Sequence, residues 1–117
     1  MKPSDALEAG RTLLPHGKDN FFTVEAGQLC ACPLGMMLIG VKTWDEVTEW
    51  SVEALNLDSA DALLDRFPNL GESRPPLCSC PIMTQHERTM SMILGHMNDK
   101  HGWNVDQVLA YLKEQGL

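Results

Sequence analysis

The four cysteines of this sequence stand in two nearly identical strings. Residues 29–34 read LCACPL and residues 77–82 read LCSCPI, so each string contains one Cys-x-Cys pair. In an extended chain, residues i and i+2 point to the same side, so each pair could present two sulfurs together. Four thiolates are one ligand set of tetrahedral structural zinc sites. The candidate zinc ligands are therefore Cys30, Cys32, Cys78 and Cys80.

Two other interpretations of these cysteines remain open. Cysteine is among the most buried residue types, so all four could be free thiols in the core. They could also form disulfides, although the lack of an apolar secretory segment after Met1 favours a reducing, intracellular compartment in which disulfides are rare. The methionines that follow both strings would suit Cu(I) as well, but no compact Met-x-x-Met or Cys-x-x-Cys loop accompanies them.

A thiol-dependent enzyme is a further interpretation of the second string. A nucleophilic cysteine there would need His86 or His96 as its base. These histidines fall on one expected helix and point in roughly opposite directions. No other residue is indicated that would hold the base. We therefore expect no catalytic residue, and we interpret His16 and His101 as cations that complement helix ends.

Capping residues divide most of the chain into expected helices. The clearest signals are residue pairs with the spacing of a capping box: Thr43 and Glu46, Thr84 and Glu87, and Asn104 and Gln107. The expected helices cover residues 4–14, 34–39 (closed by Gly40), 43–55, 58–67 (opened by Asp58 or Ser59), 84–97 and 104 onward.

One β-hairpin is expected between the first two helices. Residues 21–24 are rich in strand formers, Gly27 permits a tight turn, and residues 29–32 would form the returning strand. The sequence therefore predicts a single domain over residues 1–117. Its fold class is α+β and predominantly α, with five or six short helices packed on one small β-hairpin.

The charge and hydropathy of the chain exclude two classes of partner. The net charge is −7 and the pI is about 4.9. Binding to a phosphate backbone requires clustered Lys and Arg, so we expect no direct contact with nucleic acid. The longest apolar run, residues 34–41, is far shorter than the ~20 residues of a membrane-spanning helix. We expect a cytoplasmic protein that does not enter a membrane.

An uncompensated acidic stretch occupies two successive expected helices. No Lys or Arg occurs between the first and the last of its acids, which are Asp45, Glu46, Glu49, Glu53, Asp58, Asp61 and Asp65. Such a surface could dock a protein with a basic face. An ordinary solvated helix surface is the alternative that the sequence favours.

Several short segments resemble one known group of proteins. They are residues 9–14 (AGRTLL), 16–17 (HG), 32–35 (CPLG) and 98–103 (NDKHGW). The group comprises small uncharacterised proteins encoded mainly by bacteriophages and bacteria. Their pattern is a helix ending in His-Gly, a Cys-x-Leu-Gly-Ala string, and an Asn-Asp motif before a last helix. This sequence differs at Met36, where the group has alanine, and in its second cysteine pair. The resemblance implies a phage or prophage origin and a similar shape, but no catalytic residue.

Three functional hypotheses follow from these observations. The first is a small, acidic, intracellular, non-enzymatic protein that binds another protein, as an interaction or inhibitor module. It is favoured because the chain has no phosphate loop, dinucleotide-binding glycine pattern or nucleophile motif. The alternative is a zinc-binding structural domain built on the two Cys-x-Cys pairs. The third is a thiol-dependent enzyme.

Overall fold

The computed structural model describes residues 1–41 and 52–117. Its elements, in chain order, are α1 (Pro3–Arg11), β1 (Phe22–Glu25), β2 (Gln28–Ala31), α2 (Pro33–Val41), α4 (Val52–Arg66), the 3-10 helix η1 (Pro68–Gly71), β3 (Ser73–Arg74), α5 (Pro81–Thr84), β4 (Arg88–Thr89), α6 (Met90–His101) and α7 (Val105–Glu114). This part of the chain is α+β and predominantly helical, as expected. It contains two small antiparallel strand pairs, one more than the sequence predicts.

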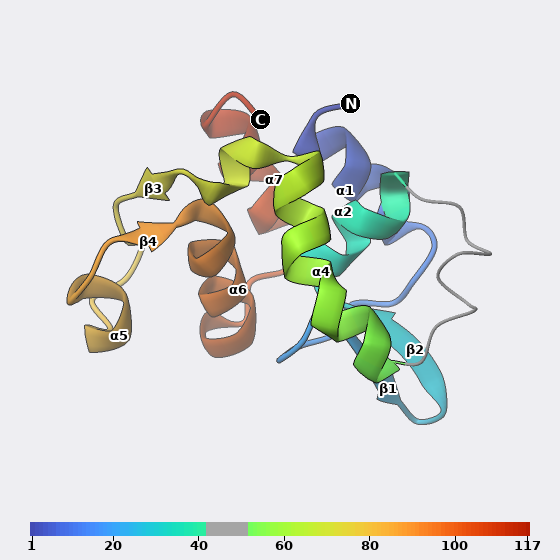
Figure 1. Cartoon of the computed structure of the whole chain (residues 1–117). Coiled ribbons are helices and arrows are strands. Elements are labelled where there is room, and N and C mark those ends of the chain that lie inside the picture. The colour runs from blue at the N-terminus through green and yellow to red at the C-terminus, as the bar shows by residue number, and fades with distance from the viewer. Residues whose placement is uncertain (42–51) are drawn as a thin grey trace.

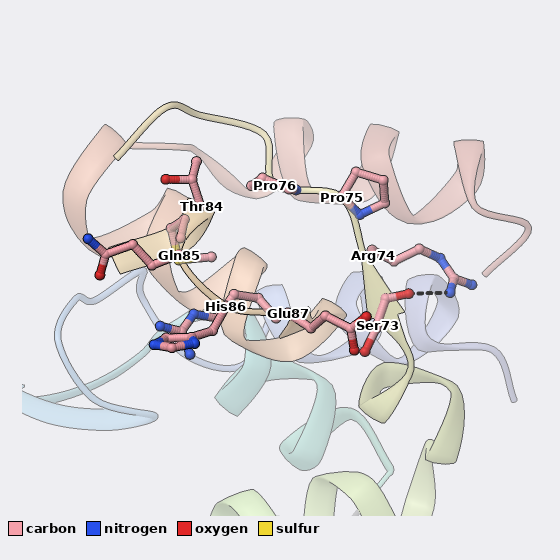
Figure 2. Close-up of a pocket in the computed structure, with 10 residues that line it drawn as sticks. Ser73, Arg74, Pro75, Pro76, Thr84, Gln85, His86 and Glu87 are labelled. Carbon is pink, nitrogen blue, oxygen red and sulfur yellow. Dashed lines mark hydrogen bonds between the residues drawn. The ribbon is translucent and has the colours of Figure 1, made fainter. Parts of the chain in front are cut away.

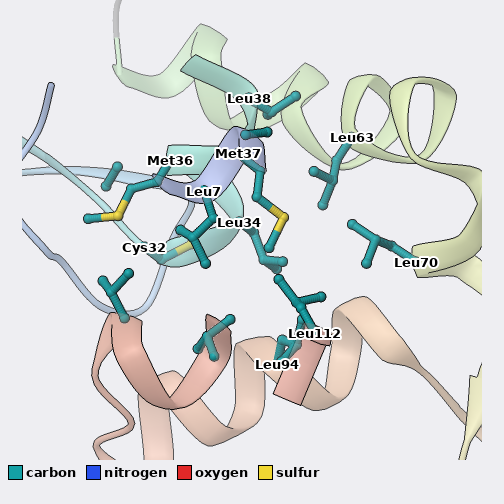
Figure 3. Packing of buried hydrophobic residues seen from close by; sticks show 14 of the residues in the cluster. Leu7, Cys32, Leu34, Met36, Met37, Leu38, Leu63, Leu70, Leu94 and Leu112 are labelled. Carbon is teal, nitrogen blue, oxygen red and sulfur yellow. The ribbon is translucent and has the colours of Figure 1, made fainter. Parts of the chain in front are cut away.

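Helix α2 lies at the centre of the core (Figures 1 and 3). Residues 33–39 are all buried, because α1, α4 and α6 pack around this helix. Figure 3 shows the Met37 side chain directed toward the space between Leu63 and Leu112. Although α2 is strongly apolar, it has only nine residues. None of the described helices is both long enough and apolar enough to cross a membrane.

Helices α1 and α2 cross at a very short distance, which two glycines make possible. A Cβ atom on Gly10 would collide with the backbone oxygen of Met36, and one on Gly40 would collide with the backbone oxygen of Ala6. The expectation that Gly40 closes its helix is wrong, since α2 continues to Val41. Glycine is required there by the close contact with α1.

The expected β-hairpin is present as β1 and β2, with Phe22 opposite Ala31. Ala26 and Gly27 both have positive φ angles, as a tight two-residue hairpin turn requires. Each strand differs from its expected range by one residue. Cys32 therefore follows β2 instead of ending it, and directly precedes α2.

Helix α4 runs without a break through the helix start expected at Asp58 or Ser59. That prediction is wrong because Ser59 is buried on the inner face of α4, together with Leu63. A continuous buried face favours one helix over two. The helix expected over residues 43–55 lies mostly outside the described residues, and its last part, residues 52–55, belongs to α4.

A second strand pair replaces the beginning of the helix expected from Thr84. Strands β3 and β4 pair antiparallel, and the guanidinium group of Arg88 donates two hydrogen bonds to the backbone oxygen of Ile82. Helix α6 begins only after β4, with Thr89 as its N-cap. The capping box expected at Thr84 and Glu87 is therefore wrong, and Thr84 is the last residue of α5.

The C-terminal end of α6 also differs from expectation. The helix passes the break expected at Asn98 and continues to His101, after which Gly102 adopts the left-handed conformation that ends it. The capping box of Asn104 and Gln107 is confirmed, and it opens α7. The extra turn of α6 brings a second histidine onto the helix that carries His96.

Candidate metal centre

The segment between β3 and β4 forms a loop over residues 75–87, here called the cysteine loop (Figure 1). It contains α5 and both cysteines of the second string. The loop rests on α6 through a small apolar cluster of Met83, Ile93 and Met97, and Cys78 and Cys80 pack at the edge of this cluster. The two sulfurs are thereby placed beside the C-terminal half of α6.

Four potential metal ligands meet at this point, namely Cys78, Cys80, His96 and His101. One ligand atom from each lies within 4.8 Å of all the others. The Sγ atom of Cys80 is 3.4 Å from Nε2 of His101, which is 3.2 Å from Nε2 of His96. In a tetrahedral zinc site the expected separations are about 3.6 Å between sulfur and nitrogen and about 3.3 Å between two nitrogens, given the usual zinc–ligand lengths. The observed distances are close to these values, so the ligand atoms are near enough to share one ion.

Local structure accounts for the placement of each ligand. His96 and His101 lie on the last turns of α6, and His101 is its final residue. Cys80 has the extended conformation of an N-cap residue, directly before Pro81 opens α5. Because Cys78 precedes it by two positions in a segment without helical structure, both sulfurs reach the same side of the loop.

The surroundings of Cys80 and His96 shift the pKa values of these two groups. A hydrogen bond with Cys78, followed by burial, raises the pKa of Cys80. Burial lowers the pKa of His96, and the nearby His101 and Lys100 lower it further. Both shifts favour the uncharged side chain, and neutral imidazole is the form that binds a metal. A divalent cation would displace the thiol protons and hold the two thiolates together.

Metal sites of more than one kind use two cysteines and two histidines. Two thiolates and two imidazoles in a tetrahedral arrangement are a standard structural zinc site. A Rieske-type iron–sulfur cluster also uses two cysteines and two histidines, but it binds them to separate irons. Here a cysteine sulfur and both histidine nitrogens lie close enough for one ion. The arrangement therefore supports a mononuclear centre.

The structure places only two of the four cysteines predicted as ligands in this group. Cys78 and Cys80 belong to it, whereas Cys30 and Cys32 do not. Cys30 is buried on β2 and its thiol donates to the backbone oxygen of Gln28. Cys32 is buried in the main core, and burial raises the pKa of its thiol to about 11.

The two cysteine strings therefore occupy different environments, although their nearly identical sequences suggest similar ones. Figure 1 shows the hairpin that leads into the first string and the α5 segment of the second at opposite sides of the molecule. The first string leads into α2, whose residues 33–39 are buried, whereas Leu77 and Ile82 of the second are exposed. The likeness of the strings is a likeness of sequence alone.

His96 and His101 were not predicted as ligands, although the sequence contains a signal for them. Two cysteines are followed by a His-x-x-x-x-His pair, and histidine spacings of this kind are typical of zinc sites. The Cys-x-Cys pair is one residue shorter than the usual Cys-x-x-Cys pair, which weakens this signal. His101 does lie in the last turn of α6, as the helix-end role requires, and it also belongs to the four-residue group.

His86 does not belong to the group of four potential ligands. It borders an open pocket of about 490 Å³ that is lined by residues of β3, β4 and the cysteine loop (Figure 2). Ser73 and Arg74 of β3 form one wall, and Thr84 and Gln85 belong to the opposite one. His86 is therefore a histidine of the same loop that can serve as a control for the two ligands.

The predicted acidic surface is described only in part. Glu53, Asp58, Asp61 and Asp65 are exposed on α4. Asp45, Glu46 and Glu49 lie outside the described residues.

The cysteines with shifted pKa values do not have the character of nucleophiles. A reactive thiolate requires a lowered pKa, whereas the pKa values of Cys32 and Cys80 are both raised. Coordination of a metal is the chemistry that the four convergent groups support. Comparison with protein-family models, with curated proteins and with solved structures gives no match to this chain.

Proposed function

We propose that this protein is a zinc-binding domain in which one ion on Cys78, Cys80, His96 and His101 fixes the cysteine loop to α6. A single observation carries the proposal. Residues 21 positions apart in the chain bring a thiol and two imidazoles to separations of 3.4 and 3.2 Å. These separations are close to the values of about 3.6 and 3.3 Å expected of ligands around one zinc ion.

The number of ligands favours a structural role over a catalytic one. Catalytic zinc keeps one coordination position for water or substrate, whereas four protein ligands close the site. The cysteine loop also has few other attachments among the described residues. It is held by the two-residue pairing of β3 with β4, by the Arg88–Ile82 hydrogen bonds and by the small cluster around Met83. A bound ion would add the strongest of these attachments.

Metal analysis of the reduced protein, purified without added metal, tests the proposal directly. We expect one equivalent of zinc per chain. In competition with a chromogenic chelator, Cys78→Ser and His96→Ala should each weaken zinc binding by at least about 100-fold, because they remove a direct ligand.

Matched variants exist for both ligand types. Cys30→Ala and His86→Ala remove a cysteine and a histidine that lie outside the group, so zinc affinity should be unchanged. The proposal would be overturned if the protein bound no zinc, or if these controls lost zinc as readily as the ligand variants.

Protein binding is a second proposal, which one observation on α4 favours. Leu57 is 81% exposed and stands beside acidic residues, including Asp58 and Asp61. A cationic amphipathic helix would cover this leucine and pair with the carboxylates. We expect such a peptide to bind the wild-type protein in a salt-dependent manner and a variant with Asp58→Lys and Asp61→Lys much more weakly. Equal binding to both proteins would refute this role.

A further inference from the structure

We propose that the zinc centre is redox-responsive: hydrogen peroxide converts the Cys78 and Cys80 thiolates into a disulfide, which expels the ion and releases the cysteine loop. This inference rests on the proposed function, since it concerns the regulation of the same site. Oxidation is the condition under which the cysteine loop would detach from α6.

The positions of the two sulfurs support this chemistry. They lie within 4.8 Å of each other, and only Ser79 separates the two residues in the chain. The segment that carries them is not part of a helix or strand, so little regular structure resists the approach of one sulfur to the other. A disulfide requires the sulfurs to approach to about 2.0 Å.

Solvent access separates this pair from the other cysteines. Cys78, Cys80 and His96 are half-buried and His101 is exposed, so a small oxidant can reach the centre. Cys30 and Cys32 are 4% and 5% exposed. Oxidation of cysteine follows thiolate character and exposure. The protein therefore contains one accessible pair that a metal would hold as thiolates, and one pair that is protected inside the fold.

The reaction balances with peroxide as the only oxidant. One thiolate attacks an oxygen of hydrogen peroxide, forms a sulfenic acid and releases hydroxide, which a proton converts to water. The second thiolate attacks the sulfenic sulfur, forms the S–S bond and expels a second hydroxide, which a second proton converts to water. Two sulfurs are each oxidised by one electron and the peroxide is reduced by two. Zinc leaves as Zn²⁺, because two imidazoles alone do not complete its tetrahedral set.

Loss of the ion would leave the cysteine loop held only by its weaker attachments. Met83 is buried against Ile93 and Met97, and after loss of the zinc–ligand bonds these apolar contacts would be the main contacts between the loop and α6. Segments with few buried contacts open at low free-energy cost. Amide hydrogen exchange over residues 75–87 should therefore become faster after oxidation, while α2 should remain protected.

The test begins with protein that carries zinc. One equivalent of hydrogen peroxide is added, and released zinc is followed with a chromogenic chelator. We expect loss of the bound zinc and a decrease in intact mass of about 2 Da, as two thiols become a disulfide. Peptide mapping should place the bond between Cys78 and Cys80, and a reductant with added zinc should restore the starting state. A variant with Cys30→Ala and Cys32→Ala should respond in the same way.

The outcomes separate this inference from the proposed function. Protein that binds zinc but keeps it in peroxide, or loses it with sulfinic acids or intermolecular disulfides, overturns the inference and leaves the zinc domain in place. Protein that binds no zinc before peroxide is added overturns the proposed function, and the inference with it.

Discussion

The imidazole of His16 and the side-chain oxygen of Asn98 lie 2.5 Å apart, although 82 positions separate them in the chain. The amide nitrogen of Asn98 donates to the backbone oxygen of Gly17 and to Asp99, so its oxygen accepts from Nε2 of His16. Asp99 in turn accepts a hydrogen bond from the backbone nitrogen of Asp19. Asn98 and Asp99 of α6 thus hold the segment before the hairpin through hydrogen bonds. His96 and His101, on the same part of the helix, lie next to the two cysteines of the cysteine loop.

Replacement of Asn98 by alanine should destabilise the fold without removing a metal ligand. Asn98 is 1% exposed, and its side chain takes part in three hydrogen bonds. At about 1 kcal/mol for each bond, the free energy of unfolding should fall by about 2–3 kcal/mol. Urea denaturation measures this change. His16→Ala is the matched variant, and it should cost less, because it leaves both amide hydrogen bonds of Asn98 intact. Equal losses would contradict the central position assigned to Asn98.

Removal of zinc should lower the melting temperature. A ligand that binds only the native state at a thousand times its Kd stabilises it by about 4 kcal/mol. We expect a strong chelator to lower the melting temperature of the wild-type protein and of His86→Ala, and to have almost no effect on Cys78→Ser, which is already deprived of a ligand. Differential scanning calorimetry with and without chelator checks this. A chelator effect that persists in Cys78→Ser would show that the ion binds elsewhere.

Burial of Cys32 predicts a specific loss of stability at alkaline pH. The pKa of this thiol rises from 9.0 to about 11 on folding. Below pH 9 the thiol is neutral in both states and its contribution is fully present. Between pH 9 and 11 the unfolded chain releases the proton and the folded chain keeps it, so about 2–3 kcal/mol of stability should be lost.

The variant Cys32→Ala isolates this effect from the titration of lysine and tyrosine. It should cost about 1–2 kcal/mol at neutral pH, as a small buried deletion does. Its unfolding free energy should then fall less steeply than that of the wild type between pH 9 and 11. Parallel curves for the two proteins would mean that Cys32 is not buried as a neutral thiol.

The sequence predicted the fold class more successfully than the site, for a physical reason. Hairpin turns and capping boxes are local signals, so the hairpin and the start of α7 were found from neighbouring residues. The same local signal failed at Thr84, because the pairing of β3 with β4 joins segments that are distant in the chain.

The candidate metal site depends on contacts between residues that are further apart in the chain. Cys80 and His101 meet because the apolar cluster of Met83, Ile93 and Met97 folds the cysteine loop onto α6. Residue types indicated that cysteines in the second string could bind a metal, but only tertiary packing identifies their partners. The repeated string suggested the wrong partners, since its first copy is buried with the core around α2.

The crossing of α1 and α2 gives a prediction that does not depend on metal. Gly40→Ala would place a Cβ atom against the backbone oxygen of Ala6, and backbone cannot move aside as a flexible side chain can. The two helices would have to separate, and overpacking of this kind costs about 1–3 kcal/mol or more.

Gly95→Ala is the matched control within a helix, because its Cβ would meet only a Leu34 methyl group at 4.0 Å. It should be neutral or stabilising by up to about 1 kcal/mol, owing to the higher helix propensity of alanine. Urea denaturation of both variants tests the crossing, and a Gly40→Ala protein as stable as Gly95→Ala would contradict it.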